Sequence, residues 1–253
     1  MAEGADITIE EARELVSNRL LWPHVRDFLW NFASSIHESW IGSLEAETSK
    51  PLNLETSKLQ SLQTSSSRVK HYILDSLNVE PCFHTFPKED GSRLLLLDGA
   101  TLESLVKWLG ALACASALRR VTDGATVRGL KSALSGVYPE VFGYTMYFGS
   151  LDVGKFGSLE GEKVGRWEGE KVGSLEVEKV GFGLMLQSLS SLSAPLIQRL
   201  KFKLPKRMTD SEPLNFETSH LPTSSPSHLP NLQPSILKLL KLKFPEAYKL
   251  CCS

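Results

Sequence analysis

The sequence has little net charge and lacks a long apolar run. Its formal net charge is −1 over 253 residues, so no overall electrostatic field draws it to nucleic acid or to an anionic membrane. The longest apolar run, residues 109–118, is too short to span a bilayer. The first residues, MAEGADITIEEARE, are acidic and lack the basic and apolar regions of a secretory signal. We therefore expect a cytoplasmic protein that does not bind nucleic acid.

Cysteine is also scarce, and the sequence contains no C-x-x-C pair. Its four cysteines are Cys82, Cys114, Cys251 and Cys252. This usage favours a reduced compartment without a disulfide framework. The tight pair Cys82 and His84 supplies two ligands, whereas a structural zinc site needs four at recurring spacings. We expect no metal site, and keep a metal-binding role for Cys82 and His84 as an alternative.

Catalytic motifs are missing as well. Neither G-x-S-x-G nor H-E-x-x-H occurs. The loop GSLDVGKF at 149–156 matches G-x-x-x-x-G-K, but Phe156 stands where a phosphate-binding loop needs a Ser or Thr to bind magnesium. We expect no enzyme and no cofactor. A nucleotide-binding protein that uses the degenerate 149–156 loop stays open as an alternative.

Repeated segments make up a large part of the sequence. Three octads follow one another, SLEGEKVG, RWEGEKVG and SLEVEKVG, at residues 158–181. A second repeat appears as PLNLETSKLQSLQTSSS from Pro51 and as PLNFETSHLPTSSPSHLP from Pro213. Such polar segments bury too little apolar surface to offset the loss of backbone entropy. We predict low-complexity inserts at about 43–67, 150–181 and 213–232, within a single mainly helical domain over residues 1–253.

The remaining sequence has the period of amphipathic helices. Apolar residues three or four apart line one face between residues 102 and 116, and small residues including Gly110 crowd that face. Asp123-Gly124 breaks the chain before a second helix that ends near Gly136. This pattern predicts an αα-hairpin core to which another helix can pack closely. Leu200, Phe202 and Leu204 alternate with lysines, which predicts a minor β element at about 199–204.

Basic residues gather in two segments near the end of the chain. The candidate partner-binding residues are Arg199, Lys201, Lys203, Lys206, Arg207, Lys238, Lys241 and Lys243. Cationic faces of this kind steer a protein toward an acidic partner surface. The second segment, from Ile236, reads as a basic amphipathic helix that Pro245 kinks or ends. Such a helix also allows peripheral membrane binding as an alternative.

These residues carry a family resemblance. Residues 102–148, with WLGALACASALRRVTDGATVRGL at their centre, resemble the SctK/YscK family of type III secretion accessory proteins. The segment FGLMLQSLSSLSAPLIQRLKFKLPKRMTDSEP from Phe182 and the closing KLKFPEAYKLCCS are also similar to that family. The repeats depart from the family pattern, because they separate segments that lie close together in it.

The resemblance implies a non-enzymatic scaffold of the injectisome sorting platform. In the family, such a subunit bridges the cytoplasmic domain of an inner-membrane ring protein to the pod protein of the platform. The resemblance therefore implies location at the cytoplasmic face of the inner membrane, where the protein is peripheral to the membrane through its partners.

Overall fold

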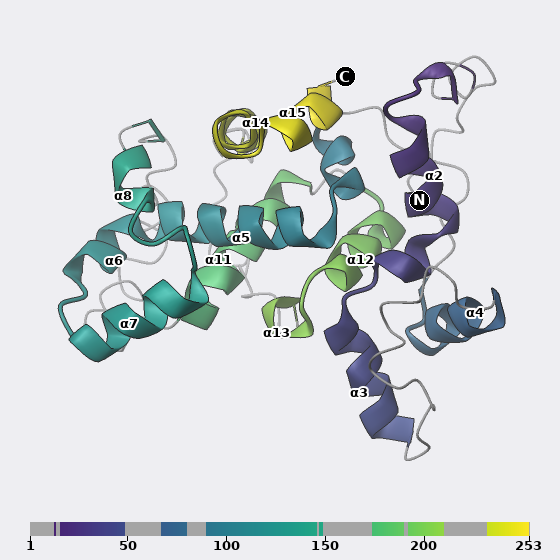
Figure 1. The fold of residues 1–253 in the computed structure, drawn as a ribbon, viewed down its shortest axis with the longest axis horizontal. Helices are drawn as coiled ribbons and strands as arrows, with labels where there is room; N and C mark the ends of the chain where they lie inside the picture. Colours follow the sequence, from purple (N-terminus) through teal and green to yellow (C-terminus); the bar gives the residue numbers. More distant parts are fainter. Residues whose placement is uncertain are drawn as a thin grey trace, which may run out of the picture. The chain divides into compact units, whose positions relative to one another are not determined.

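The structure is a computed structural model. It describes residues 13, 16–48, 67–79, 90–145, 147–148, 174–189, 192–209 and 232–252 (Figure 1). Every secondary-structure element among these residues is a helix, which confirms a mainly α protein. The chain divides into two compact units. The first comprises Met1–Leu102, Ser191–Lys206 and Phe244–Ser253, and the second Glu103–Ser190 and Arg207–Lys243. A single domain over residues 1–253 stays a prediction.

The first unit is built from short helices. They are α2 (Trp22–Trp30), η1 (Phe32–Ser35), α3 (Glu38–Thr48), α4 (Ser67–Ser76), η3 (Asp90–Leu96), α12 (Ala194–Lys203) and α15 (Pro245–Cys252). Pro23 lies in the first turn of α2, where its missing N–H is not needed for a hydrogen bond. Val25, Phe28 and Leu29 of α2 are buried. They pack in a unit where α2, α4 and α12 each contact η1, and α15 contacts η3.

The second unit contains most of α5 (Gly99–Ala113), which begins in the first unit, and most of α13 (Lys206–Thr209). Its other described helices are α6 (Ala115–Arg120), α7 (Gly124–Ala133), α8 (Val141–Tyr144), α11 (Ser174–Ser188) and α14 (Leu232–Lys243). The predicted hairpin has three helices rather than two, because the first bends at Cys114, whose φ of −92° and ψ of 8° lie outside the helical region. Asp123 caps α7 by accepting a hydrogen bond from the Thr126 N–H at 2.8 Å.

The close helix packing that small residues predict along α5 is confirmed at Gly110. A Cβ atom at Gly110 would overlap the carbonyl oxygen of Val177 in α11. A Cβ at Gly181 of α11 would in turn overlap the carbonyl oxygen of Val106. The two backbones are therefore in direct contact at this helix crossing, and glycine is required on both sides.

The predicted insert at 150–181 is wrong at its end, since residues 174–181 form the start of α11. The third octad has Val177 where the first two have Gly161 and Gly169. Val177 is fully buried, so this copy has an apolar side chain with which to join the core. The rest of that insert, the 149–156 loop and most of 43–67 and 213–232 lie outside the described residues. The described edges at 43–48, 67 and 232 are helical.

The predicted β element at 199–204 is also wrong, because residues 194–203 form α12. Leu196, Arg199, Leu200 and Lys203 are buried at spacings of three and four, which is the period of a helix. Phe202 is buried as well, because it packs edge-on against Trp40 with ring centroids 4.8 Å apart. Burial of this helix on more than one side produces the alternation that imitates a strand.

Candidate interaction surfaces

Two of the predicted partner-binding cations, Arg199 and Lys203, lie inside the first unit. Each is 4% exposed. The Arg199 guanidinium donates hydrogen bonds to the carbonyl oxygens of Phe28 at 2.5 Å and Leu29 at 3.2 Å, near the C-terminus of α2. Cations at this position complement the partial negative charge of a helix C-terminus. Arg199 therefore stabilises α2 internally and is not part of a surface.

Lys203 plays the same part at the end of η3. Its Nζ donates hydrogen bonds to the carbonyl oxygens of Leu95 at 2.6 Å and Leu97 at 2.9 Å. It also lies 5.1 Å from the centroid of the Phe28 ring. Burial lowers the pKa of Lys203 from 10.5 to about 7; the negative charge of Asp98 opposes this shift and the positive charge of Arg199 adds to it. Arg199 and Lys203, four residues apart on α12, thus donate hydrogen bonds to carbonyl oxygens at the ends of α2 and η3.

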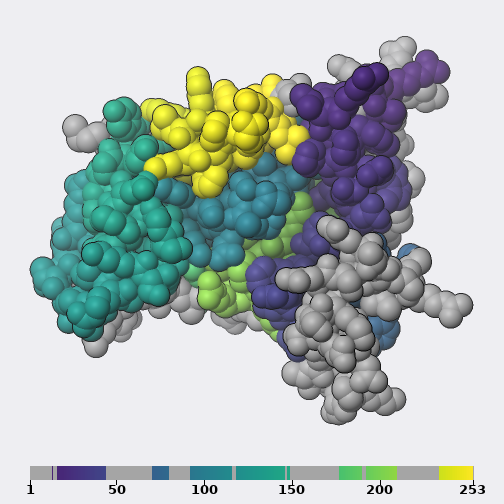
Figure 2. Space-filling view, in the orientation of Figure 1, coloured from purple at the N-terminus to yellow at the C-terminus, as the bar shows by residue number. Residues whose placement is uncertain are grey.

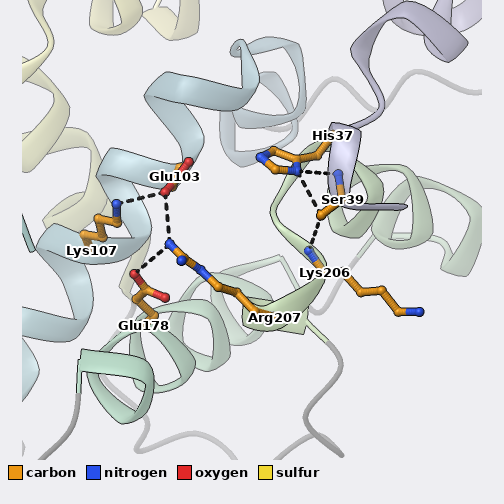
Figure 3. A network of polar contacts seen from close by, with 7 residues as sticks. All are labelled: His37, Ser39, Glu103, Lys107, Glu178, Lys206 and Arg207. Atoms are coloured by element: carbon orange, nitrogen blue, oxygen red, sulfur yellow. Dashed lines mark hydrogen bonds and ion pairs between the residues drawn. The ribbon is translucent and has the colours of Figure 1, made fainter. Parts of the chain in front are cut away.

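The other three cations of the first segment lie nearer the surface. Lys201 and Lys206 are partly exposed and Arg207 is exposed. Lys206 donates its backbone N–H to Ser39 Oγ at 2.9 Å, and Ser39 Oγ lies 2.9 Å from His37 Nδ1 (Figure 3). The Lys206 Nζ lies 5.4 Å from the Trp40 ring centroid.

Within the second unit, Arg207 joins a group of carboxylates that the sequence analysis missed. Its guanidinium lies 3.5 Å from Glu178 and 3.7 Å from Glu103, which also pairs with Lys107 at 2.8 Å (Figure 3). Glu178 is 2% exposed. Burial raises its pKa, whereas the charges of Arg207 and Lys107 oppose that shift. The octads share a Glu at this position, so the sequence alone did not distinguish Glu178 from its equivalents, Glu162 and Glu170.

The lysines of α14 divide into two kinds. Lys238 and Lys241 are exposed, while Ile236, Leu239 and Leu240 on the same helix are buried. Lys238 donates to the Tyr147 carbonyl oxygen at 2.8 Å. Ile236, Leu239 and Leu240 therefore belong to the core of the second unit, whereas Leu242 of the same helix is 47% exposed.

Lys243, by contrast, is enclosed by aromatic side chains. Its Nζ lies 4.5 Å from the Trp108 ring centroid, 4.3 Å from the Tyr144 ring centroid and 2.5 Å from Glu140 Oε2. Burial acts to lower its pKa, but hydrogen bonds with Glu140 and Tyr144 outweigh burial and raise it. Glu140 and Tyr144 are four residues apart, a spacing that places two side chains on the same face of a helix. This spacing was the feature of the sequence that could have indicated the site.

The alternative sites receive no support from the described residues. Cys82 and His84, like the 149–156 loop, lie outside that part of the chain. Within it, no three His, Cys, Asp or Glu side chains gather as metal ligands. None of the helices described there has the length and apolar character that crossing a membrane requires.

One comparison with known proteins identifies related sequences. The model of a family described as YOP proteins translocation protein K (YscK) matches residues 26–252, which is most of the chain. Comparison with curated proteins gives no significant match, and neither does comparison with solved structures.

Proposed function

Because this chain belongs to the YscK family of type III secretion proteins, we propose that it is a non-enzymatic scaffold of the sorting platform. In this role it bridges the cytoplasmic domain of the inner-membrane ring protein to the platform pod protein. It is then held at the cytoplasmic face of the inner membrane by its partners, without inserting into the lipid.

The observation that carries the proposal is the exposure of Lys238 and Lys241 on a helix anchored by its apolar side. Anchoring fixes the direction in which α14 presents these two cations, so little backbone entropy is lost when they meet a partner. Positive charges on an ordered surface accelerate encounter with an acidic partner and set the register of the complex.

A bridge also needs two docking surfaces. The candidate cations at the surface fall into two sets: Lys201 and Lys206 belong to the first unit, whereas Arg207, Lys238 and Lys241 belong to the second. Two units with a cationic set each supply the minimum that a protein with two partners requires. Arg199 and Lys203 are left out of the proposed surface because they are buried.

The double variant Lys238→Glu/Lys241→Glu tests the second set. We expect it to bind the purified ring-protein cytoplasmic domain or the purified pod protein at least ~10-fold more weakly than the unmodified chain. Lys131→Glu, an exposed charge reversal on α7, is the matched control. Lys243 is kept because it is less exposed than Lys238 and Lys241 and forms an ion pair with Glu140. Equal binding by the double variant with an unchanged circular dichroism spectrum contradicts this surface.

The membership of the assembly is tested separately in the native cell. Affinity purification of the tagged chain should recover ring and platform subunits, identified by mass spectrometry. If these subunits are present in the lysate but missing from the eluate, the bridging role is wrong.

A further inference from the structure

A stripe of alternating arginine and tryptophan runs along one side of α2. Asn18 accepts hydrogen bonds from the N–H groups of Leu20 at 3.2 Å and Leu21 at 3.0 Å, and the Trp22 N–H donates to the Asn18 carbonyl oxygen at 2.9 Å. The turn over residues 19–21 therefore leads directly into the helix. Spacings of three, four and four place four side chains on one side of it. We call these the α2 stripe: Arg19, Trp22, Arg26 and Trp30.

The stripe is open to solvent although it contains two indoles. Trp30 is 54% exposed, and Trp22 is partly exposed. Figure 2 shows the surface of the N-terminal helices, including α2, in purple. The two indole rings meet edge to face with centroids 5.8 Å apart, so each restricts the other before any partner arrives. Ordered, exposed tryptophans are typical of protein–protein hot spots, since they bury a large area with little further loss of entropy.

The charges of the stripe indicate the chemistry of its partner. Arg19 and Arg26 are both exposed. Arg26 lies 3.4 Å from Asp27, and both side chains are at least half exposed. An exposed ion pair of this kind contributes little to stability, so Arg26 can pair with a carboxylate of a partner instead. Two guanidinium groups beside two indoles are complementary to a segment that carries carboxylates next to an apolar side chain.

A protein segment fits this surface better than a membrane does. Stable insertion of a helix at a lipid surface requires a long apolar face. The α2 helix has nine residues and buries Val25, Phe28 and Leu29 in its own unit. The two indoles are the large apolar side chains of the stripe.

We propose that the α2 stripe is a docking surface for an acidic amphipathic segment of another protein subunit. The inference rests on the proposed scaffold role and adds to it a docking surface in the first unit, outside the basic residues at 199–207 and 238–243. Carboxylates of the partner pair with Arg19 and Arg26, and an apolar side chain of the partner packs against Trp22 and Trp30.

The test measures binding of full-length variants to the purified ring-protein cytoplasmic domain and to the purified pod protein. Trp30→Ala and Arg26→Glu should each weaken binding to one of the two by about 30-fold, which corresponds to a hot spot of ~2 kcal/mol. Tyr72→Ala, at a residue of α4 that is 43% exposed, and Lys131→Glu are the matched controls and should bind normally. Circular dichroism checks that every variant is folded.

Each other result overturns the inference. If the unmodified chain binds a subunit and the stripe variants bind equally well, the stripe is not a docking surface and the scaffold role stands. If the unmodified chain binds neither subunit, both proposals fail. If the unmodified chain forms a homodimer in light scattering and the stripe variants do not, the stripe binds a second copy of the chain instead. If the unmodified chain binds phosphatidylglycerol vesicles and the stripe variants do not, the stripe binds a membrane instead.

Discussion

Gly110 of α5 and Gly181 of α11 face each other so closely that a Cβ atom on Gly181 would lie 2.7 Å from the Gly110 nitrogen. Real Cβ atoms essentially never make contacts this short, and the neighbouring atom here is backbone, which cannot rotate away. The second unit is therefore built around a helix crossing that excludes every side chain at these two positions.

Gly110→Ala should destabilise the protein by ~2 kcal/mol or more, because the helices must separate to admit the methyl group. Gly129→Ala on α7 is the matched control, since its Cβ would have no atom within 4 Å. That substitution should stabilise the helix by about 0.5–1 kcal/mol through propensity alone. Urea denaturation of both variants measures the difference. Similar midpoints for the two variants would contradict the close crossing.

The sequence was sufficient to predict the helix of α5 and its close approach to another helix, because both depend on local residue types. Apolar residues every three or four positions give the face of α5, and Gly110 on that face permits contact with another helix. The identity of the partner helix was not predictable, because the third octad differs from the first by the single residue Val177. Whether that residue is buried depends on the distant α5, and no local pattern contains this information.

The burial of the basic residues, by contrast, was not predictable from the sequence. A basic residue in a sequence normally indicates a solvated surface. Arg199 and Lys203 violate this expectation because the ends of α2 and η3 supply carbonyl oxygens as acceptors. Those acceptors come from residues more than 100 positions away in sequence, so the spacing along α12 did not reveal them. Lys243 was likewise predicted as a surface charge, although Trp108 and Tyr144 enclose it.

Arg199→Met should lower the free energy of unfolding by about 2 kcal/mol. The substitution removes donors from the carbonyl oxygens of Phe28 and Leu29, a loss that is partly offset because a buried charge is also removed. Lys201→Met, at a partly exposed position of the same helix, is the matched control and should change stability by less than ~0.5 kcal/mol. Urea denaturation gives both values. Equal stability of the two variants would mean that Arg199 does not support α2.

Lys243→Met should destabilise the protein by ~1–2 kcal/mol, since the substitution removes the cation's contacts with two aromatic rings and its ion pair with Glu140. The control is Lys249→Met, which removes an ion pair with Glu246 between two largely exposed side chains. Exposed pairs contribute little, so the control should be close to neutral. Thermal unfolding should show a lower midpoint for Lys243→Met and an almost unchanged one for Lys249→Met. The reverse order would exclude a structural role for the aromatic contacts.

The buried Lys203 makes stability depend on pH above neutrality. Burial lowers its pKa from 10.5 to about 7 in the folded protein, while the unfolded chain keeps the ordinary value. Between these values the unfolded state holds a proton that the folded state has lost, so the free energy of unfolding rises with pH in this window. Below pH 7 Lys203 is protonated in both states and its contribution no longer changes with pH.

Urea denaturation between pH 7 and 9.5 should therefore show that the unmodified protein gains stability relative to Lys203→Met as pH rises. The slope of this difference should approach ~1.4 kcal/mol per pH unit, the value for one proton. Taking the difference removes other groups that titrate in the same range. Arg199 keeps its charge throughout, and Asp98 is already ionised because donors from Thr101 bring its pKa below the ordinary value despite the opposing effect of burial. A difference that does not change with pH would mean that Lys203 stays charged in the folded protein, and that the carbonyl oxygens of Leu95 and Leu97 stabilise its ammonium group enough to offset burial.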